Sequence, residues 1–306
     1  MAHNQITVLA SYVTELIFHV PRIMRLGETI EGNFETGYGG KGFNMAVAAK
    51  RSGGNVNVVM KVGKDVFGDT AVRMLNDEGI NTDTVYRDEQ KPSGAGVVLL
   101  LPTGENAIAI DSGANTMLSI DDVNRSRDLI KRSSIVLSPL EMPDPAIQRA
   151  FEICKEGDGI TILNPAPARD IPSELFRLID VITPNETETE ILTGIELRTE
   201  LDVMRAADVL LNKGVNNVII TRGGNKVYFK NGDINEFLYP PTITVVDTTG
   251  AGDAFNGALA YAMAEGRNLD DAVYYAIRYA ALKVTRKGTS KAMPTKKEIA
   301  AFNEKR

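Results

Sequence analysis

The segment Val245–Phe255 reads VVDTTGAGDAF and contains the residue types from which a phosphate site can be built. The run Thr242–Val246 is short and β-branched like a buried strand, and Ala254–Ala264 is Ala-rich and apolar like a buried helix. We therefore expect a turn that opens a helix, where backbone N–H groups lack intrahelical acceptors and the helix dipole favours an anion. The small residues whose amides an anion could approach closely are Gly250, Ala251 and Gly252.

Asp253 follows these residues and enters the first helical turn, beside the expected anion. A carboxylate in that place is unfavourable unless it takes a proton from a reacting group, so we interpret Asp253 as a general base. The alternative is that Asp253 only complements the helix dipole, which is worth about 0.3–1 kcal/mol, and that the glycines only make a tight turn.

The longer string VDTTGAGDAFNGAL resembles the C-terminal signature of the PfkB carbohydrate kinases, and within that family it is most similar to the ribokinases. The likeness covers nearly the whole chain in the family's order. The other matching stretches are GGKGFNMAVAAKRSGG at Gly39–Gly54, LNPAPAR at Leu163–Arg169, ITPNETE at Ile182–Glu188, LTGIE at Leu192–Glu196 and VTRKG at Val284–Gly288. The combination is far more specific than any one motif.

The resemblance implies an α/β fold with a mostly parallel central sheet flanked by helices, the ribokinase-like fold, and a small β lid. It implies an ATP-dependent sugar kinase that transfers the γ-phosphoryl group to a primary hydroxyl of a pentose or related sugar. The implied cofactors besides ATP are Mg²⁺ and K⁺, and the implied assembly is a homodimer formed through the lid.

Short apolar runs alternate with helical patterns along the chain, which by itself predicts βαβ units and a mostly parallel sheet. Ligands of such sheets bind beyond the carboxyl ends of the strands. The expected strands are Ile6–Ala10, Val56–Val62, Ile135–Leu140, Ile160–Leu163 and Val218–Thr221, and the expected helices are Phe67–Glu78, Pro145–Lys155 and Leu201–Lys213.

Two segments, 15–37 and 94–111, break this alternation and are strand-rich with little helical character. By resemblance they form the lid over the sugar site. No Ser/Pro-rich linker divides the chain, so we expect residues 1–306 to form a single ribokinase-like kinase domain into which the lid segments are inserted.

The substrate-binding residues are also assigned by resemblance, and their amides and carboxylates suit the adjacent hydroxyls of a polyol. They are Gly40, Gly42, Asn44, Glu141, Glu15 and Asp253. The first strand departs from the ribokinases, which have Asn and Asp where this chain has Val13 and Glu15. Either the site accepts a different sugar, or Glu15 reaches the same hydroxyls from a shifted backbone. The alternative is that Glu15 is only a solvated strand residue.

The nucleotide is expected to bind residues of the C-terminal half. By resemblance Asn185, Thr221, Gly223 and Gly252 contact the nucleotide, and Glu188 helps to place Mg²⁺ through water, which suits a cation that keeps much of its hydration shell. The alternative for Asn185 is that it caps the following helix, and the two roles are compatible.

A monovalent cation is the last ligand that the resemblance implies. The matching groups are the Asp247 carboxylate and the backbone carbonyls of Thr249, Arg286 and Gly288. Lys283 and Ala292 depart from the family's residues at two further ligand positions. We therefore predict potassium activation that is weaker than is usual in the family.

Composition excludes several classes of partner. The net charge is −6, from 34 basic and 40 acidic residues, so electrostatics do not favour nucleic acid or an anionic membrane. The single cysteine, Cys154, cannot form an intramolecular disulfide, and there is neither a signal segment nor an apolar run of about 18 residues, which predicts a cytoplasmic protein.

The G-x-G-x-x-G match at Gly37–Gly42 follows a polar segment, Glu31–Thr36, rather than a buried strand, which argues against a dinucleotide site. A Walker A motif is absent, because Gly40-Lys41 is followed by Gly42 and not by Ser or Thr. ATP must therefore be held by another device.

Three other functions are compatible with the same signature. A nucleoside kinase of this fold needs apolar groups around a base, for which Tyr12, Phe43 and Tyr38 are candidates. A kinase of sugar phosphates needs a basic pair in the acceptor site, for which Arg22 and Arg25 are candidates. A non-catalytic sugar-sensing relative is expected to lose the base or the anion site, and this chain retains both.

Overall fold

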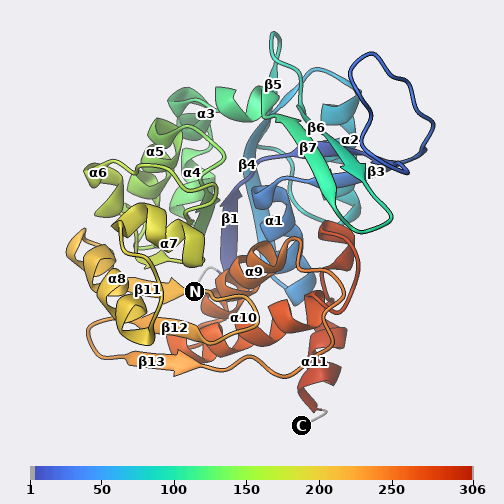
Figure 1. The fold of residues 1–306 in the computed structure, drawn as a ribbon. Helices are drawn as coiled ribbons and strands as arrows, with labels where there is room; N and C mark the ends of the chain where they lie inside the picture. The colour runs from blue at the N-terminus through green and yellow to red at the C-terminus, as the bar shows by residue number, and fades with distance from the viewer. Residues whose placement is uncertain (1–3, 305–306) are drawn as a thin grey trace.

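The computed structural model describes residues 4–304 and places a nine-stranded sheet at the centre of the molecule (Figure 1). The strand order is β13-β12-β11-β10-β9-β8-β1-β4-β5, parallel from β5 to β11, with β12 and β13 antiparallel at one edge. The strands are β1 Gln5–Leu9, β4 Asn55–Gly63, β5 Val85–Asp88, β8 Ile135–Pro139, β9 Ile160–Asn164, β10 Val181–Ile182, β11 Asn217–Ile220, β12 Val227–Lys230 and β13 Asn235–Leu238. This confirms the mostly parallel sheet expected from the alternating pattern.

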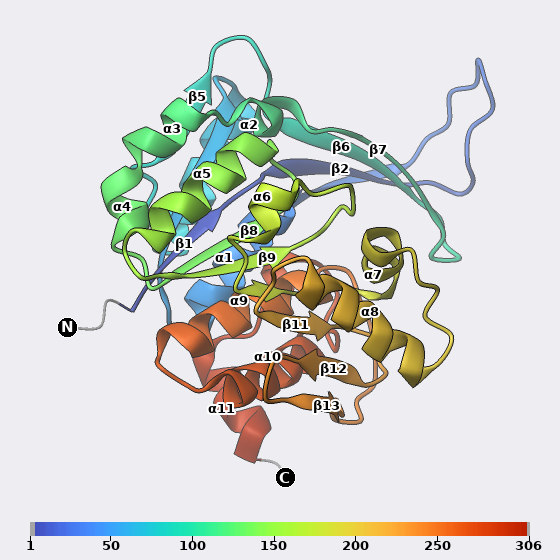
Figure 2. The same ribbon diagram turned by 90° about the vertical axis from the view of Figure 1, so that its left-hand side faces the viewer.

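Helices cover both faces of the sheet (Figure 2), which is why the inner strands are apolar on both sides. Helices α1 Lys41–Ser52, α2 Val66–Asp77, α9 Ala251–Ala264, α10 Leu269–Lys283 and α11 Lys296–Glu304 pack into one core cluster. The other cluster contains α3 Ile120–Arg125, α4 Arg127–Lys131, α5 Asp144–Lys155, α6 Ser173–Phe176, α7 Glu186–Thr193 and α8 Glu200–Asn212. The expected helices lie within one residue of α2, α5 and α8.

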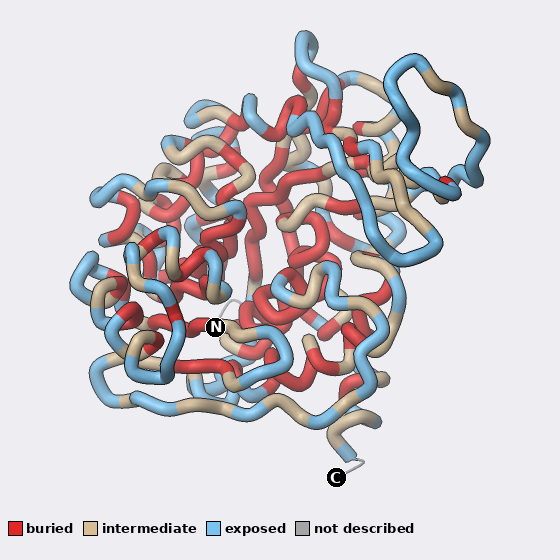
Figure 3. The backbone as a smooth tube through the Cα atoms, in the orientation of Figure 1, coloured by how far each residue is buried: buried red, intermediate tan, exposed pale blue. Residues whose placement is uncertain are grey.

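The lid is a separate four-stranded sheet of order β3-β2-β6-β7 at the upper right of Figure 1. Its strands are β2 Val13–His19, β3 Asn33–Gly39, β6 Gly94–Leu100 and β7 Asn106–Asp111. These strands match the two predicted segments, and the connection 20–32 between β2 and β3 is a largely exposed loop (Figure 3).

The lid is attached to the body at both ends of its first hairpin. β2 begins shortly after β1 ends, and β3 ends at Gly39, immediately before Gly40 and α1. The Asn115 side chain holds the first attachment, because it accepts from Tyr12 N at 2.9 Å and donates to Tyr12 O at 2.8 Å. Val13 pairs with Gly39 at the base of the lid.

The strand predicted at Thr242–Val246 is wrong. This run is irregular, and Val245 and Val246 are 54% and 61% exposed. The sheet ends at β13, and the run follows Pro240-Pro241, so no neighbouring strand pairs with it. The N–H groups of Val246 and Asp247 instead donate to the Val284 carbonyl, at 2.8 and 3.1 Å.

Candidate active site

The turn at residues 248–253, here called the anion turn, opens α9 with unpaired amides. Gly250 is the N-cap residue with φ 75°, a left-handed conformation that favours glycine, and no side chain of the described residues caps this helix. The Ala251 N–H donates to the Thr248 carbonyl at 3.0 Å. Within the described chain the amides of Gly250, Gly252 and Asp253 have no hydrogen-bond acceptor, so they can bind an oxyanion.

Asp253 is buried at the start of α9, with 6% of its surface exposed. Its carboxylate accepts a hydrogen bond from the Asn44 side-chain amide at 2.8 Å. Burial raises the pKa of Asp253 to about 6, while the Lys41 ammonium and the Asn44 hydrogen bond lower it. An oriented carboxylate with this pKa can accept a proton near neutral pH.

Asn44 lies in the first turn of α1, directly after the lid hairpin. A Cβ at Gly40, where φ is 95°, would collide with the backbone of Ser11, and a Cβ at Gly42 would collide with that of Ala10. Both glycines therefore let the start of α1 approach the carboxyl end of β1. The Asn44 Oδ1 atom is buried and has no hydrogen-bond partner among residues 4–304, so it is available to accept from a ligand hydroxyl.

Glu141 follows β8 and reaches the start of α1. Its carboxylate accepts from the Lys41 backbone N–H at 2.8 Å and from the Ser11 hydroxyl. The Ser11 hydroxyl in turn accepts from the Gly42 N–H at 3.1 Å. Ser11 was not predicted from the sequence, because only its position at the end of a strand could have indicated this role.

Glu15 is half-buried on lid strand β2 and is not a freely solvated residue. Its carboxylate lies across Gly37 and Gly39 of β3, where added Cβ atoms would collide with it. Burial raises its pKa, and the Asp247 carboxylate raises it further. The lid carboxylate therefore faces the body of the molecule near the anion turn, and the unsubstituted glycines make room for it.

The predicted nucleotide residues gather beyond β10 and β11. Asn185 and Glu188 form a capping box, in which Asn185 Oδ1 accepts from Glu188 N and Glu188 Oε2 accepts from Asn185 N, both at 2.8 Å. Thr221 forms an isolated parallel bridge with Asn185. Gly223 lies on the exposed loop that follows, with φ 56°.

Glu188 is buried in that capping box and is the residue expected to place Mg²⁺. Burial raises its pKa, which the Asn185 N–H and the Lys41 ammonium counteract. Since one carboxylate leaves lone pairs free beyond its two contacts to Asn185, it can accept from the waters of a hydrated Mg²⁺. The residues therefore fit a water-mediated metal contact.

Asn256 joins the segment just before Asn185 to the anion turn. Its Oδ1 accepts from the Thr183 hydroxyl at 2.6 Å, and its Nδ2 donates to the Gly252 carbonyl at 2.9 Å. Neither Asn256 nor Lys41 was predicted as a site residue, although both stand inside the motifs GAGDAFNGAL and GGKG. The signal that could have found them is therefore the motif itself.

Among the predicted cation ligands, the structure brings Asp247, Thr249 and Gly288 together. The Asp247 carboxylate accepts from Gly288 N at 2.8 Å and Thr249 N at 2.9 Å. The Thr249 carbonyl is already in contact with the Lys283 ammonium. The Arg286 side chain pairs with Glu298 at 2.9 Å. An ammonium thus meets one of the predicted carbonyl ligands of the monovalent ion.

The structure places the candidate residues of two alternative functions. Tyr38 is half-buried on β3, with the Lys291 ammonium 5.5 Å from its ring centroid, and stays a candidate. Tyr12 and Phe43 are fully buried and pack edge to face with ring centroids 5.4 Å apart, so neither can cover a base. Arg22 is exposed and paired with Glu28 within the loop between β2 and β3, and the Arg25 N–H donates to the same carboxylate at 2.9 Å. The basic pair thus belongs to the lid loop.

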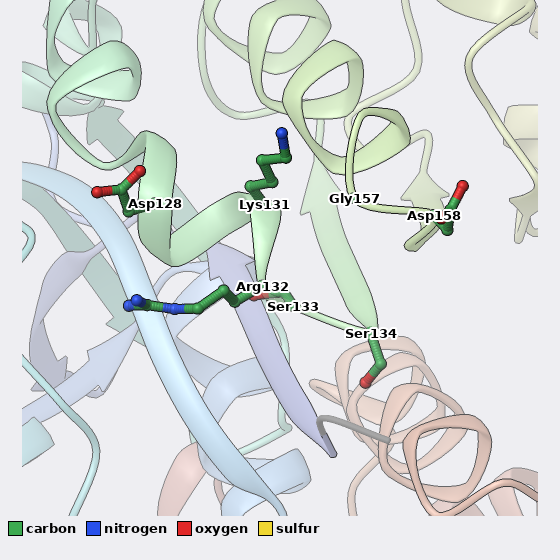
Figure 4. Close-up of a pocket in the computed structure, with 7 residues that line it drawn as sticks. All are labelled: Asp128, Lys131, Arg132, Ser133, Ser134, Gly157 and Asp158. Atoms are coloured by element: carbon green, nitrogen blue, oxygen red, sulfur yellow. The ribbon is translucent and has the colours of Figure 1, made fainter. Parts of the chain in front are cut away.

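A pocket of about 450 Å³ elsewhere on the molecule lies near the start of β8 (Figure 4). Its lining residues are Asp128, Lys131, Arg132, Ser133, Ser134, Gly157 and Asp158. The side chains labelled in Figure 4 point in different directions instead of converging on one centre. This pocket is at the amino end of the strands, opposite the end where ligands of such sheets bind.

Comparison with known proteins assigns the family. Residues 3–296 match the pfkB family carbohydrate kinase description. The chain is 38% identical over 300 residues to a ribokinase of Haemophilus influenzae, covering 98% of each, and 36% identical over 301 residues to a deoxyribokinase of Salmonella typhimurium, covering 98% and 97%. It superimposes on an Arabidopsis thaliana ribokinase complexed with ribose and ATP with a TM-score of 0.90, at 30% identity and 99% coverage of both chains. This chain belongs to the pfkB family of carbohydrate kinases.

Proposed function

We propose that this kinase transfers the γ-phosphoryl group of ATP to a primary hydroxyl of a pentose or a closely related sugar. The observation that carries the proposal is the pairing of a buried carboxylate, Asp253, with the unpaired amides of the anion turn beside it. A base and an oxyanion site in one helical turn are what phosphoryl transfer to an alcohol requires.

In this mechanism Asn44 orients Asp253, which takes the proton of the sugar hydroxyl. The amides of Gly250 and Gly252 stabilise the charge on the transferring group, whereas the Ala251 amide is already bonded to Thr248. The Lys41 ammonium acts on both Asp253 and Glu188, so it adds positive charge between the sugar and nucleotide sides. Glu188 would hold Mg²⁺ through water, and the bound cation would neutralise phosphate charge.

ATP binding is assigned to Asn185, Thr221, Gly223 and Gly252. Three observations support the assignment: the Asn185–Thr221 bridge, the unpaired Gly252 amide, and Asn256, which bonds both Thr183, two residues before Asn185, and the Gly252 carbonyl. Asn185 can contact a nucleotide while it caps the helix. Both of its side-chain bonds run to Glu188, at the start of the helix.

The sugar contacts are assigned to Asn44, Glu141, Glu15 and the loop at Gly40 and Gly42. The unpartnered Asn44 Oδ1 is a ready acceptor for a hydroxyl. A site that hydrogen-bonds a hydroxyl can reject an analogue lacking it by about 10⁴–10⁵-fold, whereas apolar contacts discriminate about 10–200-fold. Val13 has no side-chain amide that could bond a hydroxyl. We therefore expect ribose to be a moderate substrate or one of several accepted sugars, deoxyribose included.

The remaining proposals concern the whole protein. A single domain with an inserted lid is supported by the two contiguous core clusters on the central sheet. A homodimer through the lid is supported by apolar side chains exposed on its strands: Phe34, Val97, Ile108 and Ile110.

None of the described helices is long and apolar enough to span a bilayer. The lone cysteine supports a cytoplasmic location.

Potassium activation stays a prediction of the resemblance. The contact of Lys283 with the Thr249 carbonyl favours the opposite result, because the ammonium already occupies one of the predicted ligands of the ion.

The test is ADP formation by the purified protein across pentoses, deoxypentoses, hexoses and nucleosides, with Asp253→Asn as the blank. We expect phosphorylation of ribose, deoxyribose or both, abolished in the variant. Turnover of nucleosides alone would overturn the proposed substrate class. ATP hydrolysis that no sugar stimulates would overturn the proposed transfer.

A further inference from the structure

Lys283, the last residue of α10, is a fully buried lysine that none of the assigned roles explains. Lysine is almost never fully buried unless its ammonium is paired, because removing the charge from water costs several kcal/mol. Burial lowers its pKa, and the carboxylates of Asp247 and Asp253 raise it. The position of the ammonium therefore has to be explained by what it contacts.

The Lys283 ammonium lies beneath the anion turn. It donates to the Asp247 carbonyl at 3.2 Å and to the Thr249 carbonyl, the two backbone oxygens that flank Thr248. Both acidic neighbours, Asp247 and Asp253, attract it. A single positive charge is thus bonded to the backbone that precedes Gly250.

This contact set does not fit a potassium site. An alkali cation needs several oxygen ligands around one centre, of which the Thr249 carbonyl was predicted to be one. The ammonium uses that oxygen, and a second cation at contact distance would be repelled by it. The residues present therefore disagree with the monovalent-cation site that the resemblance implies.

We infer that Lys283 is a tethered cation that takes the place of a monovalent ion in this kinase. It is a positioning residue: by holding the Asp247 and Thr249 carbonyls it keeps the amides of Gly250 and Gly252 turned toward the phosphoryl group. This inference rests on the proposed phosphoryl transfer. It makes the turnover of this chain independent of potassium.

The experiment compares the wild type with Lys283→Ala in potassium chloride and in tetramethylammonium chloride at matched ionic strength. Three quantities are measured: kcat/KM for the best sugar, the Kd of a non-hydrolysable ATP analogue and the Tm. Lys155→Ala is the matched control, because Lys155 also ends a helix and bonds a backbone carbonyl and an acid, Gly159 O and Asp180, far from the site.

We expect the wild type to differ by less than about twofold between the salts. Lys283→Ala should lose about 10²-fold in kcat/KM in tetramethylammonium, the scale of a lost oxyanion contact, and recover at least about tenfold in potassium. Its Tm and its affinity for the ATP analogue should also rise in potassium, since an ion that binds only the folded state stabilises it. Lys155→Ala should show no salt preference.

Wild-type activation by potassium of more than about tenfold would overturn the inference, and so would equal behaviour of Lys283→Ala in the two salts. A potassium response in Lys155→Ala would show that the salt dependence reflects general stability. This result would also overturn the inference on Lys283. If no sugar is turned over, the proposed transfer fails, whereas the salt dependence of the Tm and of analogue binding still decides the role of Lys283.

Discussion

The anion turn and the lid meet at the same site but are built differently. Asp253 is 6% exposed and is bonded to Asn44 of α1, and Asn256 bonds the turn to Thr183. Glu15 is half-buried and packs mainly on the glycines of its own hairpin. A change in the turn therefore disturbs several elements, whereas a change in the lid stays local. The chemistry therefore depends on the turn, and the choice of sugar depends on the lid. Mutations in the turn should lower kcat for every sugar, whereas mutations in the lid should change the substrate ranking.

The strongest test of this separation is Asp253→Asn. It should lower kcat by about 10²–10⁴-fold for every sugar, the usual contribution of a positioned general base. The substrate ranking and the affinity for ATP should not change. The variant should melt at or above the wild-type temperature, because a buried carboxylate is removed. Retention of more than about a tenth of wild-type turnover would show that Asp253 is not the base.

The pH dependence should follow the same carboxylate. A protonated Asp253 cannot accept the hydroxyl proton, so kcat/KM should fall about tenfold per pH unit below about 6 and level off above 7. The folded protein holds this proton more tightly than the unfolded chain does, so the contribution of Asp253 to stability is lost as the pH rises through about 6. The profile of Glu15→Gln should keep the same inflection. If the inflection in kcat/KM disappears in Glu15→Gln, the titrating group is the lid carboxylate and not Asp253.

The lid side of the contrast is tested by the double variant Val13→Asn with Glu15→Asp. It should raise kcat/KM for ribose relative to the other sugars by about tenfold, because an amide and a shorter carboxylate restore polar contacts to hydroxyls. The kcat for the best wild-type sugar should change little. An unchanged ranking across the sugar panel would mean that these positions do not select the sugar.

The smallest effect on rate is expected from the outer surface of the lid. Phe34→Asp places a charge on the lid face opposite Glu15, where Phe34 is 54% exposed, and should shift the molar mass by light scattering toward the monomer. The kcat should stay within about twofold, because no residue of the anion turn is touched. Ile191→Asp on α7, at a position 55% exposed, is the control and should leave the mass unchanged. Equal masses for the two variants would rule out this dimer surface.

The same contrast explains what could be predicted from the sequence. The lid strands and the helix after the anion turn were predictable, because local patterns and motifs carry them. The positions of Asp253 and Asn185 at helix starts followed from the same motifs, while their roles stay predictions. The strand at Thr242–Val246 was wrong because a β-branched run becomes a strand only where a neighbour pairs with it, and pairing is a tertiary property. Lys283 was recognised as a departure from the family pattern. That its ammonium reaches the Thr249 carbonyl depends on how the end of α10 packs against the turn, which no local pattern contains.

The attachment of the lid has a consequence for product release. Val13 and Gly39 pair at its base, and the next residue after Gly39 is Gly40, the N-cap of α1. A rotation that lifts β3 must therefore change the backbone angles at Gly40, whose close approach to Ser11 positions the start of α1. We expect opening of the lid and disassembly of the sugar contacts to be one mechanical event, so that a phosphorylated sugar is loosened by the motion that exposes it to solvent.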